Sequence, residues 1–377
     1  MKRRALDVIS EFKVVLCAGP GGVGKTTTSA TLALSAAVSG KKVCVLTIDP
    51  ARRLADALGI RLDNEPHQVD CQPLLSEGLQ VRGELWAMML DPAKTFDGLI
   101  NRIAPTQKIA DSVLNNLIYR QMSRGLAGTI EYTAVEKLYS LYTSSDFDLV
   151  IVDTPPSKNV LDFLEAPEWI SRFMDEKAFK WFSLLDPKEP ATGLKENLVK
   201  KTGRVVWEVL DRTLGRELAT HFTDFIHSIR SMAGEFRERG DCVAQMLRSE
   251  DCSFLIVTAP NEIVLRDARF LCKEIRDRGI QFSGFVVNRA SPGAELEALG
   301  EAFDSLKKQA GDDPAAAEFF EQLTRLAELK AAQGAEDWRL IRQLRQDTAW
   351  DGFLGVLPKQ TQEITDLNSL HGLALQF

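Results

Sequence analysis

The stretch that most constrains this chain is residues 19–26, Gly-Pro-Gly-Gly-Val-Gly-Lys-Thr, which fits the phosphate-loop pattern G-x-x-x-x-G-K-[ST]. Its glycines let successive backbone N–H groups turn toward the phosphates of a nucleotide. Lys25 is expected to reach the β- and γ-phosphates, and the Thr26 hydroxyl to bind Mg²⁺. The residues expected to contact the nucleotide here are Gly19, Gly21, Gly22, Val23, Gly24, Lys25, Thr26 and Thr27.

The flanking sequence supports this interpretation. Residues 13–18 (KVVLCA) form a short apolar run that predicts a buried strand, and residues 26–38 predict a helix that ends at Ser39-Gly40. A phosphate site needs strand, loop and helix in this order, because the helix N-terminus supplies aligned N–H dipoles. The alternative, a glycine-rich turn without a ligand, does not account for this context.

Composition narrows the class of protein. At 377 residues the chain predicts one large domain with insertions, or two domains. A net charge of −7 gives no electrostatic footprint for nucleic acid. No stretch approaches the roughly 18 apolar residues of a membrane span, and the start of the chain lacks the apolar core of a signal peptide. The six cysteines are scattered without a CxxC pair, which predicts a reduced, cytoplasmic protein.

Strand-like runs alternate with helical segments along the chain. This alternation predicts an α/β fold with a doubly wound, mostly parallel sheet. We expect a single domain over residues 1–377, with helical insertions at 93–142 and 166–247 and a further helical segment at 294–346 that includes a turn at 311–314. Beyond the first strand, the predicted strands are residues 42–48, 85–90, 148–152, 253–258, 282–287 and 353–357.

Two aspartates follow predicted strands, where open α/β sheets bind their ligands. Asp153 is expected to orient Mg²⁺ through water, and its alternative role is that of an acidic residue ending a buried strand. Asp49 is expected to orient the attacking water and is a second candidate for the metal site. The alternative for Asp49 is that it caps a helix begun by Pro50.

The residues after the late strand bear on base selectivity. Phosphate-loop GTPases generally read guanine with an aspartate in an Asn/Thr-Lys-x-Asp segment, whereas residues 287–290 are Val-Asn-Arg-Ala. The Asn288 amide offers the donor and acceptor that pair with adenine. The sequence therefore favours ATP over GTP.

Several motifs occur together in one known order: residues 19–27, Thr47-Ile-Asp49-Pro-Ala-x-x-Leu-x-Asp56, Met89-Leu-Asp91-Pro92, residues 147–164, Val286-Val-Asn288 and Leu357-Pro358. With them the chain resembles the arsenite-pump ATPase (ArsA) family, which includes the eukaryotic ATPase that targets tail-anchored membrane proteins. The resemblance implies a phosphate-loop NTPase fold of the SIMIBI class and a dimeric or pseudo-dimeric ATPase that uses ATP and Mg²⁺. It also implies that Asp49 is the switch I carboxylate, that switch II begins at Asp153, and that Asn288 and the backbone near Pro358 bind adenine.

Three departures from the family pattern limit what the resemblance implies. The family usually has a lysine just after the first glycine of the loop, and this chain has Pro20. We hypothesise that Lys158 or Arg52 supplies the missing cation at the transferring phosphate. Cysteines that would bind metalloid have no counterparts near residues 124–131 or 155–160, and the zinc-binding CxxC of the eukaryotic targeting ATPase is absent.

The leading functional interpretation is a homodimeric, ATP-driven switch whose 166–247 insertion handles a hydrophobic client or a membrane-protein partner. The aromatic run at 169–185 suggests an exposed binding patch, although apolar residues at helical spacing usually pack in a core. The alternatives are a soluble ATPase subunit driving a membrane anion pump and a non-hydrolysing, ATP-bound scaffold. A positioning ATPase of the MinD/ParA type is disfavoured, because residues 365–377 lack lysine and arginine.

Overall fold

The strands of the described chain form one eight-stranded sheet in the order β3-β4-β2-β5-β1-β6-β7-β8. All neighbouring strands pair in parallel except β3 and β4, which are antiparallel. The parallel strands lie within a few residues of their predicted positions, and the doubly wound α/β fold is confirmed. The strands are β1 (Val14–Ala18), β2 (Lys42–Thr47), β3 (His67–Gln68), β4 (Glu84–Met89), β5 (Leu149–Asp153), β6 (Cys252–Thr258), β7 (Phe282–Ala290) and β8 (Phe353–Pro358).

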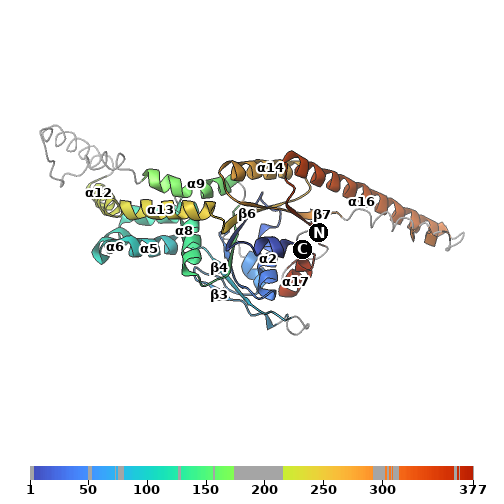
Figure 1. Cartoon of the computed structure of the whole chain (residues 1–377), viewed down its shortest axis with the longest axis horizontal. Coiled ribbons are helices and arrows are strands. Elements are labelled where there is room, and N and C mark those ends of the chain that lie inside the picture. Colours follow the sequence, from blue (N-terminus) through green and yellow to red (C-terminus); the bar gives the residue numbers. More distant parts are fainter. Residues whose placement is uncertain are drawn as a thin grey trace.

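The structure is a computed structural model, drawn in Figure 1. It describes residues 4–49, 53–72, 74, 80–125, 129–155, 158–173, 215–291, 302–303, 305–306, 308, 314–360, 363–364 and 366–376.

Alternate side chains of the strands enter two hydrophobic clusters, one on each face of the sheet. Val15 and Cys17 of β1 belong to the cluster beneath α1 (Ala5–Ile9), α2 (Lys25–Val38), α3 (Arg53–Leu58) and α17 (Leu367–Ala374). Val14 and Leu16 belong to the cluster on the opposite face. Both faces are therefore covered, which explains why the parallel strands read as continuous apolar runs.

The second face carries the helices that connect the strands on that side. Asp91 caps α5 (Pro92–Ile103) by accepting from the Lys94 backbone N–H at 3.1 Å, with Pro92 at the first helical position. The predicted helical stretch 93–142 is divided further than its glycines suggested. Gly125 ends α7, and Gly128, the other glycine of the expected break, lies outside the described residues. The helices are α5, α6 (Gln107–Leu114), α7 (Leu117–Gly125), α8 (Thr129–Ser144), α9 (Lys158–Phe173), α12 (Arg216–Ser231) and α13 (Ala233–Arg248).

Part of the apolar stripe predicted for the second insertion packs in the core, while Leu218 and Phe222 of the same stripe are half-buried. Phe225, Ile229 and Met232 are buried and belong to the same cluster as the β5 side chains. The remainder of the stripe, from Leu194 to Leu214, and most of the aromatic run at 169–185 lie outside the described residues. The described part of this insertion therefore favours core packing over an exposed binding patch.

Two further helices flank β7. Helix α14 (Glu262–Asp277) lies beside the sheet, and α16 (Pro314–Asp347) runs from the sheet away from the body of the molecule (Figure 1). Leu340, Ile341 and Leu344 near the C-terminal end of α16 are buried in the sheet cluster. Residues 311–313 of the predicted turn lie outside the described residues, and α16 begins at Pro314. Among the described helices, we find none with the length and apolarity to cross a bilayer.

Candidate nucleotide-binding site

Residues 19–24 connect β1 to α2 at the carboxyl edge of the sheet, and two of the glycines are sterically required. Gly19 has φ +152°, and a Cβ there would lie 2.0 Å from the Val257 carbonyl oxygen of the neighbouring strand β6. Gly24 precedes α2 with φ +93°, a left-handed conformation that other residues adopt at a cost. The loop therefore passes close to β6 and leads into the N-terminus of α2, whose backbone N–H groups can bind an anion.

Lys25 folds back onto the loop that it follows. Its ammonium group donates to the carbonyl oxygens of Gly19 and Pro20, each at 3.0 Å. The side chain is buried, and burial lowers the pKa of Lys25 although the carboxylates of Asp153 and Asp49 oppose that change. Phosphate oxygens would replace these carbonyl acceptors with charged ones, so the lysine is placed to exchange a loop contact for a stronger ligand contact.

Asp153 joins the ends of two strands to the first turn of α2. Its Oδ2 accepts from the Thr26 hydroxyl at 2.7 Å and from the Thr47 hydroxyl at 3.1 Å. Burial raises the pKa of Asp153 to about 6, and the two hydroxyl hydrogen bonds act in the opposite direction. These contacts bring together Thr26 and Asp153, the two residues that the sequence analysis selected for the metal site. They add Thr47, which it did not select.

The same carboxyl fits a magnesium site. The buried Oδ1 of Asp153 has no hydrogen-bond partner among the described residues, and a buried acceptor of this kind requires a ligand or water. The described residues contain no group of three or more His, Cys, Asp or Glu side chains that could hold a metal alone. Mg²⁺ binds one or two protein oxygens together with substrate phosphates and water, and the Thr26 hydroxyl and the Asp153 carboxylate are oxygen ligands of that kind.

Asp49 follows β2 at the same edge of the sheet. Its backbone N–H donates to the Thr47 hydroxyl at 3.3 Å, and its side chain is close enough to raise the pKa of Asp153. Helix α3 begins at Arg53, several residues beyond Asp49, while residues 50–52 lie outside the described residues. Thr47 thus contacts both the Asp153 carboxylate and the backbone of the second candidate acid.

Asn288, at the end of β7, also lies at the phosphate loop. Its Nδ2 donates to the Val23 carbonyl oxygen at 2.9 Å, and its Oδ1 accepts from the Arg289 backbone N–H at 2.9 Å. Pro358 at the end of β8 pairs with Ala290, and the Lys359 N–H donates to the Ala290 carbonyl oxygen at 3.0 Å. The two residues predicted to bind adenine therefore lie on adjacent strand ends.

Comparison with known proteins agrees with this geometry. The family model for the anion-transporting ATPases, ArsA, matches residues 12–312. The chain belongs to the ArsA ATPase family. The match includes the phosphate loop, Asp49, Asp153 and Asn288.

Individual ArsA relatives are divergent from this chain. The Babesia bovis protein named ATPase ASNA1 homolog is 26% identical over 296 residues, covering 78% of this chain and 71% of that protein. The Aquifex aeolicus protein named putative arsenical pump-driving ATPase 2 is 23% identical over 290 residues, covering 74% of this chain and 81% of that protein. The Paramecium tetraurelia protein named ATPase ASNA1 homolog 2 is 29% identical over 165 residues, 44% of this chain and 47% of that protein, so this match spans about half of the relative.

The structure describes some of the remaining predicted site residues of this ArsA-family chain and not others. Gly21 and Gly22 are exposed at the tip of the loop, Val23 is buried, and Thr27 lies half-buried in the first turn of α2. Lys158 begins α9, and the position of its side chain is outside the described structure. Arg52 also lies outside the described residues.

Two residues that sequence reasoning did not select lie in the site. Thr47, the last residue of β2, could have been found from its polar side chain at the carboxyl end of a buried strand. Arg53 begins α3, is exposed, and acts on Lys25 as a positive charge that contributes to its lowered pKa. The sequence alone does not distinguish Arg53 from its neighbour Arg52 as the arginine near the phosphates, because nothing in it fixes the first residue of α3.

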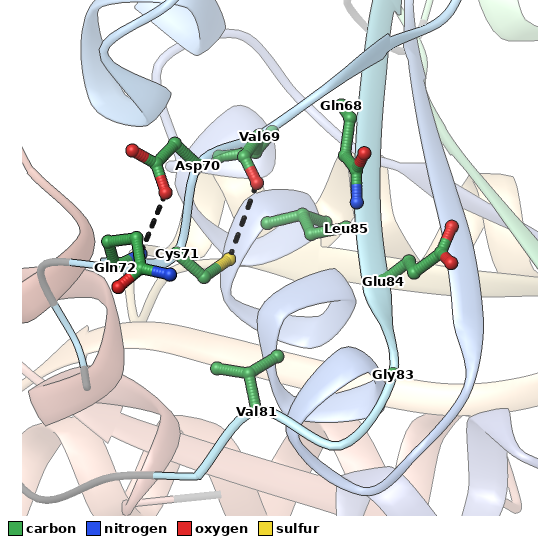
Figure 2. Close-up of a pocket in the computed structure, with 9 residues that line it drawn as sticks. All are labelled: Gln68, Val69, Asp70, Cys71, Gln72, Val81, Gly83, Glu84 and Leu85. Atoms are coloured by element: carbon green, nitrogen blue, oxygen red, sulfur yellow. Dashed lines mark hydrogen bonds between the residues drawn. The ribbon is translucent and has the colours of Figure 1, made fainter.

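A separate cavity of about 370 Å³ lies at the β3–β4 edge of the sheet (Figure 2). Cys71 donates to the Val69 carbonyl oxygen at 3.7 Å, and the Gln72 N–H donates to Asp70 at 2.9 Å. Burial raises the pKa of the Cys71 thiol, which makes it a poor nucleophile. This cavity shares no lining residue with the phosphate loop.

Proposed function

We propose that this chain binds Mg-ATP at the phosphate loop and hydrolyses it. The observation that carries the proposal is the convergence of Lys25, Thr26, Thr47 and Asp153 at the N-terminus of α2. A helix N-terminus, a buried lysine and a carboxylate with one unpartnered oxygen are the groups that phosphoryl transfer requires. Membership in the ArsA family supports the same activity.

Each residue has a distinct part in the proposed reaction. Thr26 and Asp153 would hold Mg²⁺, with Asp49 as an additional candidate, and the ion would neutralise charge on the phosphates. Lys25 binds the phosphate oxygens, and Asp49 orients the water. The water oxygen forms a bond to the γ-phosphorus while the bond to the bridging oxygen breaks. ADP leaves with that electron pair, and Asp49 accepts the proton that the water loses. We assign Lys158 or Arg52 to the developing negative charge, in place of the cation that Pro20 does not provide.

We further propose that ATP switches a cytoplasmic homodimer that handles a hydrophobic client or a membrane-protein partner. The buried side chains of α12 do not support a client surface there, because Phe225, Ile229 and Met232 pack in the core. Leu117 and Ile130 are exposed on α7 and α8, at 44% and 42%, and they are candidates for a client surface. Sedimentation with and without ATP tests the dimer, and photocrosslinking from residues 117 and 130 tests the client surface.

A calorimetric titration tests the nucleotide assignment. We expect ATP to bind more tightly than GTP, to bind more weakly when EDTA removes Mg²⁺, and to lose affinity in Lys25→Ala. Lys108→Ala, which removes an exposed lysine of α6, is the matched control and should bind as the wild type does. Equal affinity for ATP and GTP would contradict the base assignment, and unchanged affinity in Lys25→Ala would contradict the site.

The pump-driving alternative has one supporting observation. The match to the Aquifex aeolicus pump-driving homologue covers 81% of that protein, a larger share than the matches to the other two relatives described above. ATP turnover that rises on adding arsenite would favour that alternative over client handling. Tight ATP binding without turnover would favour the scaffold alternative.

A further inference from the structure

Asn288 occupies an unusual position between the end of the sheet and the phosphate loop. Its side chain is 8% exposed and donates to the Val23 carbonyl oxygen at 2.9 Å across 265 residues of sequence. A Cβ on Gly24 would lie 2.4 Å from Asn288 Nδ2, so the absence of a side chain at position 24 makes room for the amide. The amide therefore packs directly against the backbone that begins α2.

The backbone around Asn288 is shaped to hold this amide in place. Arg289 has φ +62°, a left-handed conformation that is costly for a residue other than glycine. The β7–β8 register shifts between Val287 and Ala290, which marks a bulge at this point. The turned backbone brings the Arg289 N–H onto Asn288 Oδ1 at 2.9 Å, so the strained residue fixes the orientation of the amide.

We propose that Asn288 is a positioning residue that braces the phosphate loop through Val23. The brace rests on the proposed nucleotide site and extends it, because it assigns Asn288 a function toward the phosphates rather than the base alone. The carboxamide has two donor hydrogens and two acceptor lone pairs, and the described contacts use one of each. The brace and adenine recognition can therefore operate together.

Inorganic tripolyphosphate separates the two functions, because it has the phosphates of ATP and no base. In Asn288→Ala we expect affinity for Mg-tripolyphosphate and for Mg-ATP to fall by similar factors, each about tenfold, as for one lost buried hydrogen bond. Asn288→Asp should weaken both at least as much, because it places a carboxylate oxygen against the Val23 carbonyl. Asn101→Ala is the matched control, since the Asn101 amide also donates to a backbone carbonyl, at 3.0 Å, but at an exposed position on α5.

Hydrogen exchange of the nucleotide-free protein provides a readout that does not depend on binding. The Thr28 N–H donates to the Gly24 carbonyl oxygen at 2.9 Å, and we expect this amide to exchange faster in Asn288→Ala than in the wild type or Asn101→Ala. Weakened ATP binding with unchanged tripolyphosphate binding and unchanged exchange would overturn the brace and leave a base-reading residue. Unchanged binding of both ligands would also overturn it. If the wild type binds neither ligand, the ATP proposal fails, and the Thr28 exchange rate still decides the brace.

Discussion

The Thr26 hydroxyl donates to Asp153 Oδ2 at 2.7 Å, joining the first turn of α2 to the end of β5. The two residues are 127 positions apart in sequence, and only the parallel pairing of β1 with β5 brings their elements together. This contact places a hydroxyl and a buried carboxylate where a phosphate-bound metal ion would lie. The metal-binding part of the proposed site depends on this contact.

Replacing Thr47 is expected to lower the rate of ATP turnover as well as the stability of the fold. Thr47→Val removes the donor to Asp153 and the acceptor of the Asp49 N–H. We expect a stability loss of about 1–2 kcal/mol and a lower kcat with little change in ATP affinity. Thr95→Val is the control, because Thr95 is also buried and donates to Asn64 at 3.0 Å outside the site. Equal kcat values in the two variants would refute a role for Thr47 in the site.

The missing loop lysine predicts a strong effect from another cation. We expect Lys158→Ala or Arg52→Ala, or both, to lower steady-state ATP turnover by about 10³-fold. This is the effect typical of a cation at a transferring phosphoryl group. Arg53→Ala tests the neighbouring charge that acts on Lys25. Exposed Arg61, just beyond α3, provides the control Arg61→Ala. Wild-type rates in both Lys158→Ala and Arg52→Ala would exclude both candidates.

Glu136 and Arg239 form a buried ion pair between α8 and α13. Their charged atoms approach to 2.6 Å, and the Glu136 side chain is 3% exposed. Glu136→Ala leaves the Arg239 guanidinium without its partner, and we expect it to cost about 3–5 kcal/mol in urea unfolding. The exposed pair Glu336–Arg339 on α16 is the comparison, where Glu336→Ala should cost far less because water screens the two charges. Similar losses from the two substitutions would contradict the assigned importance of burial.

Asp251 is expected to make stability depend on pH. Its Oδ2 accepts from the Tyr142 hydroxyl at 2.7 Å and from the Lys13 ammonium at 3.0 Å, which lowers the pKa of Asp251. The carboxylate therefore stabilises the fold fully above about pH 4, the ordinary aspartate pKa, and this contribution is lost as pH falls through the lower folded value. The stability difference between wild type and Asp251→Asn, measured by urea unfolding, should shrink in that acidic range.

Much of the fold could be predicted because parallel strands buried on both faces are apolar throughout. The strands from β1 to β8 other than β3 appear in sequence as such runs, and the phosphate loop follows from its glycines. The edge strand β3 is a two-residue exposed pair, His67–Gln68, with no apolar signal. The α6–α7 boundary was also missed, since it depends on Asn116, whose amide donates to the His221 carbonyl oxygen at 2.7 Å in a distant helix.

The sequence indicated which residues belong to the candidate site but not which of them contact one another. Lys25, Thr26, Asp49, Asp153 and Asn288 could be selected because each follows a strand or lies in the loop. Their contacts could not be selected, because the bonds from Thr47 to Asp153 and from Asn288 to Val23 depend on strand order and on the bulge at Arg289. These are properties of the assembled sheet rather than of local sequence.

The most direct test is steady-state ATP hydrolysis measured over a range of protein concentrations, with Lys25→Ala and Asp49→Asn as controls. The proposed dimeric ATPase predicts a rate per chain that rises with concentration and is lost in both variants. Tight ATP binding with no hydrolysis at any concentration, or wild-type hydrolysis in either variant, would contradict the account.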